Sequence, residues 1–309
     1  MTRAVLVALA LFGCDKVVDA TTNQHDRCEK NKDIAVCFQL GKANLEQAIP
    51  NNTAARRYLS KACTFHHAEA CNLLGTMVNA AKGGPRDPKR AAELFDIACK
   101  GKVATACVEL GTMLFEGDGI TKDAERAVVM FQSTCGGEPA QPRACTALGR
   151  AHVQGDGIEG KPSLEVAERM FRKACAADHA PGCVEVGALF RTKTASRPQE
   201  RSENQTTAME FFHKACRIEP SQGCFELAEM HRDKELPEPS DHKASLLFQK
   251  ACQADPTRGC FEAAELMSSS TRLDARSSEI ESLYNLACDH GHTEACTKRS
   301  VTPRGEPSP

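Results

Sequence analysis

Cysteine is the residue whose number and spacing first indicate chemistry in this sequence. The chain of 309 residues contains 17 cysteines, and no two of them form a Cys-x-x-Cys or Cys-x-x-Cys-His motif. Zinc ribbons and haem attachment sites therefore lack their usual ligand spacing. Disulfides remain, and because they persist only in an oxidising compartment, the cysteine content predicts an exported protein.

Sixteen of the cysteines fall into local pairs, six of which enclose seven residues. From Cys63 to Cys288, the first members of the pairs follow one another at intervals of 36, 36, 40, 41, 36 and 36 residues. A near-constant period of this size is typical of a solenoid repeat. The predicted disulfides are Cys28–Cys37, Cys63–Cys71, Cys99–Cys107, Cys135–Cys145, Cys175–Cys183, Cys216–Cys224, Cys252–Cys260 and Cys288–Cys296.

The N-terminal segment resembles an export signal. Arg3 precedes nine apolar residues, 4–12, a run too short to span a bilayer but sufficient for the core of a signal peptide. The sequence Leu-Phe-Gly-Cys14 resembles a bacterial lipobox, which implies lipid attachment at Cys14. We therefore expect residues 1–13 to be a signal peptide and the protein to be a periplasmic or membrane-anchored lipoprotein. The alternatives are an ordinary secretory signal with Cys14 incidental, and a secreted protein.

One motif could belong to a hydrolase. Ser240 and Lys243 match the Ser-x-x-Lys of β-lactamases, but no Ser-Asp-Asn or Lys-Thr-Gly follows. Ser240 also occupies the position before a predicted helix that Asp87 and Asp123 occupy in other repeats. The repeat position explains the serine better than a nucleophile does, so we predict no catalytic residue.

Metal, cofactor and nucleic-acid sites are not expected. His66-His67 and His290-x-His292 each offer two ligands in a turn, and each Gly-Asp-Gly turn (117–119, 155–157) offers one carboxylate. The net charge of −2 gives no basic surface for nucleic acid or for a membrane beyond a lipid anchor.

Two helices per repeat must position the cysteines. In the first, which we call helix A, a small residue follows the second cysteine of the pair by four positions, as Gly111 follows Cys107. Because glycine destabilises a helix by about 1 kcal/mol relative to alanine, its recurrence predicts close approach by a second helix. These small residues are Gly41, Gly75, Gly111, Gly149, Gly187, Ala228 and Ala264.

The second helix, helix B, carries the phrase Ala-x3-Phe-x2-Ala-Cys, whose spacing forms one apolar stripe. It ends at the first cysteine of the next pair, so each disulfide should tie neighbouring repeats together. Asp87, Asp123, Ser163 and Ser240 are the predicted N-caps. The polar stretch 192–205 is predicted to be a protruding flexible loop.

These phrases resemble Sel1-like repeats, relatives of the tetratricopeptide repeat, and with the added cysteines the cysteine-rich subfamily first described in Helicobacter. The resemblance implies an all-α fold without β-sheet: a right-handed α/α superhelical solenoid of about seven helix pairs over residues 28–299. Residues 14–27 would be a flexible linker and residues 300–309 a disordered tail. Some members carry a β-lactamase label, which keeps a penicillin-binding or β-lactamase activity open as the alternative function.

The favoured function is a non-catalytic scaffold that binds a protein, peptide or glycan partner as a monomer. By resemblance to tetratricopeptide repeats, the concave face is lined by helix A, at positions −2, +1, +5 and +8 from its cysteine. A solvated helix face without a partner is the alternative. The candidate partner-binding residues are Arg143, Arg150, Arg191, Phe225, Glu229, Arg232, Arg258, Phe261 and Glu265.

Overall fold

A computed structural model describes residues 24–30, 32–158, 162–236, 238–270 and 277–299. The predicted signal peptide, Cys14 and the C-terminal tail lie outside these residues. Within the described ranges every regular element is a helix and no strand occurs, as the sequence predicts. None of the helices in these ranges has the length and apolar character needed to cross a membrane.

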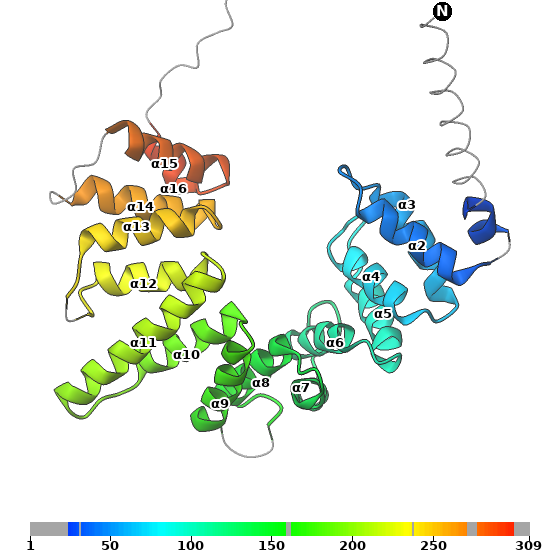
Figure 1. Cartoon of the computed structure of the whole chain (residues 1–309), viewed down its shortest axis with the longest axis horizontal. Helices are drawn as coiled ribbons and strands as arrows, with labels where there is room; N and C mark the ends of the chain where they lie inside the picture. The colour runs from blue at the N-terminus through cyan, green and yellow to red at the C-terminus, as the bar shows by residue number, and fades with distance from the viewer. Residues whose placement is uncertain (1–23, 31, 159–161, 237, 271–276, 300–309) are drawn as a thin grey trace, which may run out of the picture. The chain divides into compact units, whose positions relative to one another are not determined.

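The helices form a repeating series of A–B hairpins, which is the solenoid predicted from the cysteine period (Figure 1). The A helices are α2 (Ile34–Leu45), α4 (Ala68–Asn79), α6 (Ala104–Glu116), α8 (Pro142–Gln154), α10 (Ala180–Thr192), α12 (Gln222–Arg232), α14 (Pro256–Ser269) and α16 (Thr293–Lys298). The B helices are α3 (Asn52–Thr64), α5 (Pro88–Lys100), α7 (Ala124–Gly136), α9 (Leu164–Ala176), α11 (Pro198–Ile218), α13 (Asp241–Cys252) and α15 (Ser277–Asp289).

The chain divides into two compact units. The first comprises Met1–Ala144 with Gly155–Lys161, and the second comprises Cys145–Gln154 with Pro162–Pro309. Inside each unit, helices that follow one another in the sequence pack side by side, as α12, α13, α14 and α15 do in Figure 1. Each repeat therefore contacts mainly its neighbours, as expected of a solenoid.

Short polar side chains begin the B helices at the predicted positions. The carboxylates of Asp87 and Asp123 each accept a hydrogen bond at 3.0 Å from the backbone N–H three residues later. The hydroxyls of Ser163 and Ser240 do the same at 3.3 Å. These bonds satisfy donors that the first turn of a helix leaves unpaired, so the predicted N-caps are confirmed.

The recurring glycine of helix A lies against the phenylalanine of helix B. A Cβ added at Gly111 would lie 2.7 Å from the Phe131 ring, and one at Gly149 would lie 2.4 Å from the Phe171 ring. The phenylalanines are almost completely buried, and each forms the centre of its repeat. The close approach that the glycines predict is therefore confirmed, because a larger residue would collide with the ring.

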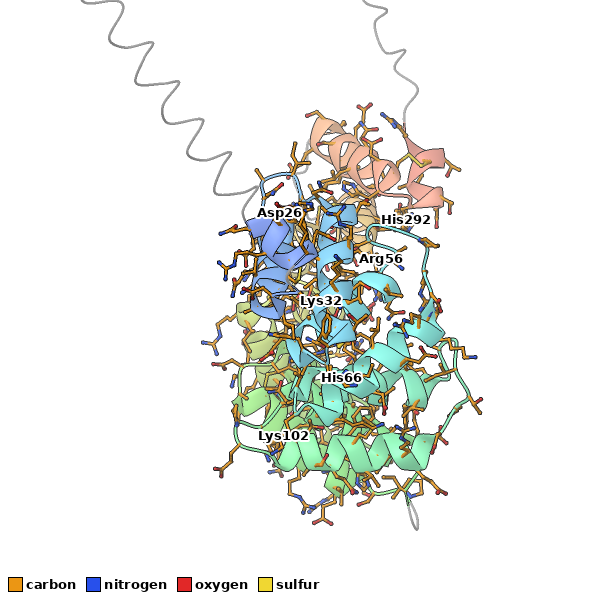
Figure 2. All side chains as sticks on the ribbon, turned by 90° about the vertical axis from the view of Figure 1, so that its right-hand side faces the viewer. Asp26, Lys32, Arg56, His66, Lys102 and His292 are labelled. Carbon is orange, nitrogen blue, oxygen red and sulfur yellow. A yellow bond between two sulfur atoms is a disulfide. The ribbon has the colours of Figure 1, made fainter. Side chains whose placement is uncertain are left out.

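Disulfides close the turn between each B helix and the A helix of the next repeat. Seven bonds join cysteines eight or nine residues apart, with Cα–Cα distances of 4.5–4.9 Å, and Cys135 and Cys145 are disulfide-bonded as well. Several of these turns reverse through a residue with left-handed backbone, including His66 (φ 61°) and Lys102 (φ 65°), both labelled in Figure 2. The disulfides thus span inter-repeat turns, as predicted.

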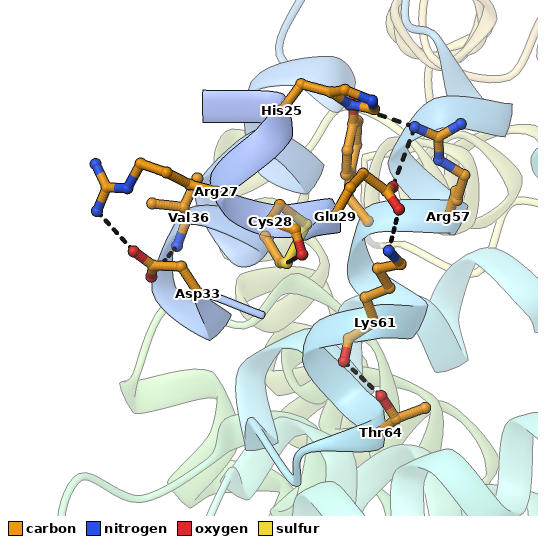
Figure 3. Close-up of a disulfide and its surroundings, with 11 residues drawn as sticks. His25, Arg27, Cys28, Glu29, Asp33, Val36, Arg57, Lys61 and Thr64 are labelled. Atoms are coloured by element: carbon orange, nitrogen blue, oxygen red, sulfur yellow. Dashed lines mark hydrogen bonds and ion pairs between the residues drawn. A yellow bond between two sulfur atoms is a disulfide. The ribbon is translucent and has the colours of Figure 1, made fainter. Parts of the chain in front are cut away.

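The linker predicted over residues 14–27 is wrong at its C-terminal end, because residues 24–29 are helical. His25 Nδ1 lies 2.9 Å from the Tyr58 hydroxyl, and Glu29 forms ion pairs with Arg57, at 3.2 Å, and Lys61 of α3 (Figure 3). These contacts hold the segment against the first B helix.

The flexible loop predicted over residues 192–205 is also wrong over most of its length. Helix α10 continues to Thr192, and α11 begins at Pro198, which occupies the first turn, where proline is favoured. The added turns bring Asn204 into a buried position. The insertion therefore lengthens a hairpin.

Candidate functional site

A ladder of ion pairs joins the A helices of successive repeats. In each of four repeats, the glutamate two residues after the second cysteine accepts a hydrogen bond from an arginine of an adjacent A helix. The pairs are Arg143–Glu109 (2.5 Å), Arg150–Glu185 (2.6 Å), Arg191–Glu226 (2.9 Å) and Arg232–Glu262 (2.7 Å). Four of the predicted partner-binding arginines are thus bound to the protein's own carboxylates.

Arg191 is the centre of the largest group of these pairs. Its guanidinium binds both oxygens of Glu235, at 2.9 and 2.8 Å, together with Glu226 at 2.9 Å and Glu229 at 3.2 Å. Asp233 lies 3.7 Å away, and the Arg191 side chain is only 19% exposed. A two-point pair between guanidinium and carboxylate fixes both groups in one orientation.

Arg232 and Arg258 extend this group along the same helices. Arg232 binds Asp233 at 2.8 Å, and Arg258 lies 3.4 Å from Glu229. We call the resulting set the Arg191 network. Its members are Arg191, Glu226, Glu229, Arg232, Asp233, Glu235, Arg258 and Glu262.

The network has an excess of negative charge, because five carboxylates face three guanidinium groups. The hydrogen bonds that Arg191 donates to Glu235 and Glu229 raise the pKa of its guanidinium although burial opposes them, so the positive charge of Arg191 is secure. Burial, followed by the neighbouring charge of Glu229, raises the pKa of Glu226 despite Arg191.

The remaining candidate residues lie at the contacts between repeats. Phe225 is buried, with the Arg258 guanidinium 3.6 Å from its ring centre, and Phe261 is buried and stacked on His292 at 4.0 Å. Glu265 pairs with Lys298 of the last A helix and accepts a hydrogen bond at 2.6 Å from Tyr284. The exposed part of this face is accordingly formed by charged side chains.

Sequence reasoning missed Asp233 and Glu235, which follow the end of α12 and fall outside the repeat positions. A signal for the ladder was nevertheless available. A glutamate recurs two residues after the second cysteine, while arginines recur at positions −2, +5 and +8. Opposite charges at fixed positions of successive repeats are typical of pairing across the repeat interface.

The other sites weighed from the sequence have structural roles. The Ser240 hydroxyl caps α13 by accepting from the Lys243 backbone N–H, as a repeat position predicts. His67 and His292 cap α4 and α16, accepting at 3.3 and 3.2 Å. Asp156 of the second Gly-Asp-Gly turn pairs with Lys122 at 2.8 Å. Among the residues that the structure covers, no three His, Cys, Asp or Glu side chains gather as metal ligands would.

Helix hairpins joined by regular inter-repeat contacts define a helical-repeat protein. The chain belongs to the Sel1 repeat family, whose model matches residues 34–64, 68–102, 104–135, 142–179, 199–218 and 221–256. All sixteen cysteines in the described residues are disulfide-bonded, which indicates an oxidising environment outside the cytoplasm.

Three solved structures of bacterial proteins are similar to this chain. A Sel1 repeat protein of Oxalobacter formigenes is 16% identical, with a TM-score of 0.65, and the match covers 84% of this chain and all of that one. A protective antigen of uropathogenic Escherichia coli is 17% identical with a TM-score of 0.48, and the match covers 86% of this chain but only 63% of the antigen. The Helicobacter pylori cysteine-rich protein B is 27% identical with a TM-score of 0.33, over 43% of this chain and 95% of that one. No curated protein sequence matches significantly.

Proposed function

We propose that this protein is a non-catalytic scaffold of the bacterial cell envelope that binds a protein partner through the Arg191 network. The observation that carries the proposal is the excess of carboxylates held in fixed positions across three consecutive A helices. Membership of a helical-repeat family supports a protein partner, because such arrays bind along extended surfaces. The envelope location is supported by the disulfides and by the signal-like residues 1–14.

The charge of the network determines the chemistry of the partner. Its arginines are already paired with internal carboxylates, so an anionic partner would have to displace those bonds. Asp233, Glu235 and Glu262 keep 40%, 29% and 27% of their side-chain surface exposed and can accept further hydrogen bonds. A segment rich in lysine or arginine therefore complements this face, and because the carboxylates are already oriented, binding orders few side chains.

Capture from envelope extract tests the proposal. Wild-type protein with intact disulfides is immobilised beside the double variant Asp233→Lys/Glu235→Lys. The matched control is Glu203→Lys/Glu210→Lys, which makes the same charge change at two exposed residues of α11 that form no ion pair with the network. We expect a crosslinked partner with a basic contact segment to be retained by wild type and control and lost by the network variant.

Salt supplies an independent check, because interactions between exposed charges weaken as ionic strength rises. Partner release should increase steeply between low and high salt for the wild type. A partner captured equally by the network variant, or one whose crosslinked segment is acidic, would show that the Arg191 network is not the binding face. Circular dichroism of each variant establishes that the helices are intact.

A further inference from the structure

A second candidate site lies between α11, α12 and α13 and uses no residue of the Arg191 network. Here the structure contains a cavity of 630 Å³, open on one side. Its walls are largely apolar and are formed by Met209, Leu236, Leu246 and Leu247. Leu246 is 53% exposed, so part of the apolar wall is open to solvent. The volume lies within the range of small-molecule sites.

His231 lines this cavity and is out of place among the apolar side chains. It is 94% buried, with only 6% of its surface exposed, and its Nδ1 atom has no hydrogen-bond partner. At the same position of other A helices stand Val78, Leu114, Phe190 and Met267, whereas α2 has Asn44 and α8 has His152, whose Nδ1 atom also lacks a hydrogen-bond partner. A buried polar atom without a partner costs folding free energy, so a ligand that hydrogen-bonds to His231 Nδ1 would remove that cost.

The equivalent groove of the first unit shows what the cavity lacks. There Asp96 of α5 and Arg126 of α7 stand at the positions of His213 and Lys243, and they form an ion pair of 2.9 Å. In the second unit both positions can carry only positive charge. Neither the His213 imidazole nor the Lys243 ammonium has a hydrogen-bond or ion-pair partner among the described residues.

Lys243 and Glu238 are the charged side chains that line the cavity, and the charges of Arg217 and Lys250 also act on His213. Burial lowers the pKa of His213, and the cations Arg217, Lys250 and Lys243 lower it further. Burial likewise lowers the pKa of His231, followed by the charge of Lys243. Glu238 is the one carboxylate among the lining residues of the cavity. The site therefore combines a largely apolar interior with two imidazoles and with the Lys243 ammonium, which has no partner among the described residues.

We propose that this cavity binds a small amphiphilic carboxylate, with its apolar body against the leucines and Met209, its carboxylate at Lys243, and His231 as an internal hydrogen-bonding group. Free fatty acids of medium length and the apolar C-terminus of a peptide share this chemistry. The size of the cavity and its single buried polar group favour the small molecule, because a peptide would bring backbone groups that the apolar walls cannot satisfy.

Titration of the full disulfide-bonded protein with decanoate, below its micelle concentration at pH 7, tests the proposal. The charge control is decyltrimethylammonium, which has the same chain and the opposite head group. We expect saturable binding of one decanoate and at least about tenfold weaker binding of the cation. Equal affinity for both would overturn the proposed role of Lys243.

Variants copied from the first unit locate the site. His213→Asp restores an acid opposite Lys243, as in the Asp96–Arg126 pair, and should weaken decanoate binding by about tenfold or more, as should Lys243→Gln. Arg126→Gln removes the cation at the same position of the first groove and should leave the affinity unchanged. Loss of affinity in Arg126→Gln, or none in His213→Asp, would place the ligand elsewhere.

His231→Leu separates binding from folding. Because it removes an unpartnered polar atom from a position that is apolar in four other repeats, the thermal midpoint should stay the same or rise, while decanoate binding weakens several-fold. Unchanged affinity would contradict a role for the imidazole. An acetylated peptide ending in Leu-Leu as the free acid completes the test, because tighter binding of that peptide than of decanoate would overturn the small-molecule assignment.

Discussion

The guanidinium of Arg191, at the end of α10, donates hydrogen bonds of 2.9 and 2.8 Å to the two carboxylate oxygens of Glu235. Glu235 follows α12 in the next repeat. Arg191→Met would leave Glu226, Glu229 and Glu235 close together without their shared cation. We expect the free energy of unfolding to fall by about 2 kcal/mol, because removal of one partner strands partly buried charges. Arg90→Met, which breaks an exposed pair with Glu93, should cost less than about 0.5 kcal/mol. Equal losses in urea denaturation would show that the network adds nothing to stability.

The contact between Gly111 and Phe131 predicts a specific coupling. Gly111→Ala places a methyl group 2.7 Å from the ring and should destabilise the protein by about 1–3 kcal/mol, although alanine favours helix. In the first hairpin the corresponding glycine, Gly41, packs on Leu59 instead. The double variant Gly111→Ala/Phe131→Leu should therefore be more stable than the sum of the single variants predicts. A double-mutant cycle measures the coupling, and strict additivity would contradict direct contact.

The left-handed turn at Lys102 predicts a stabilising substitution. A lysine with φ 65° is strained, whereas glycine adopts this backbone without cost. Lys102→Gly should raise the free energy of unfolding by about 0.5–1 kcal/mol. Lys100→Gly, two residues earlier in the last turn of α5, should lower it instead. Thermal denaturation of the two variants and the wild type measures both effects. A midpoint for Lys102→Gly below that of the wild type would contradict backbone strain at Lys102.

Removal of one inter-repeat disulfide should lower the free energy of unfolding of the protein. The double variant Cys252→Ser/Cys260→Ser opens a loop of seven enclosed residues, for which chain entropy predicts a loss of about 2–3 kcal/mol. Alkylation before and after reduction, read by mass spectrometry, should find no free thiol among the sixteen cysteines of the wild type until reductant is added. Free thiols in protein isolated from the envelope would contradict the oxidised state.

Acid should release the N-terminal helical segment. A hydrogen bond from Lys61 lowers the pKa of Glu29 although burial opposes it, and the charges of Lys61, Arg57 and His25 act in the same direction (Figure 3). A carboxylate with a lowered folded pKa stabilises the fold above its ordinary pKa near 4.5, and that contribution disappears as the pH falls through the folded pKa. Glu29→Gln should therefore reduce hydrogen-exchange protection of residues 24–30 at pH 7 and have little effect at pH 2.5. A loss that is the same at both pH values would contradict the ionic origin.

Local patterns in the sequence predict most of this fold, because each repeat is built from short-range signals. The Ala, Phe and Cys phrase places helix B, Asp87 and Ser240 mark its start, and Gly111 marks the close helix contact. The prediction of a loop over residues 192–205 is wrong because polarity alone does not distinguish a loop from an exposed helix. Pro198 and the residues after it form the first turns of α11.

The candidate sites are harder to predict than the fold. The arginines were identified as an exposed binding surface, but whether Arg191 faces solvent or a neighbouring glutamate depends on how adjacent repeats pack. Glu235 lies after the end of α12, outside the repeat positions, so the repeat pattern does not predict its pairing with Arg191. The same holds for His231, since only the structure shows that its side chain lines a cavity.

The inter-repeat disulfides join cysteines that are only eight or nine positions apart, and this short separation affects how the disulfides form. When an unfolded polypeptide crosses a membrane with its N-terminus leading, the two cysteines of a pair emerge almost together, long before the next pair. Correct oxidation then requires only nearest-neighbour collisions, and low contact order makes these fast. Sixteen thiols could in principle form many incorrect disulfides. If the chain crosses the membrane from its N-terminus, few other thiols are available when each pair becomes oxidised, so the order of translocation favours the correct disulfides.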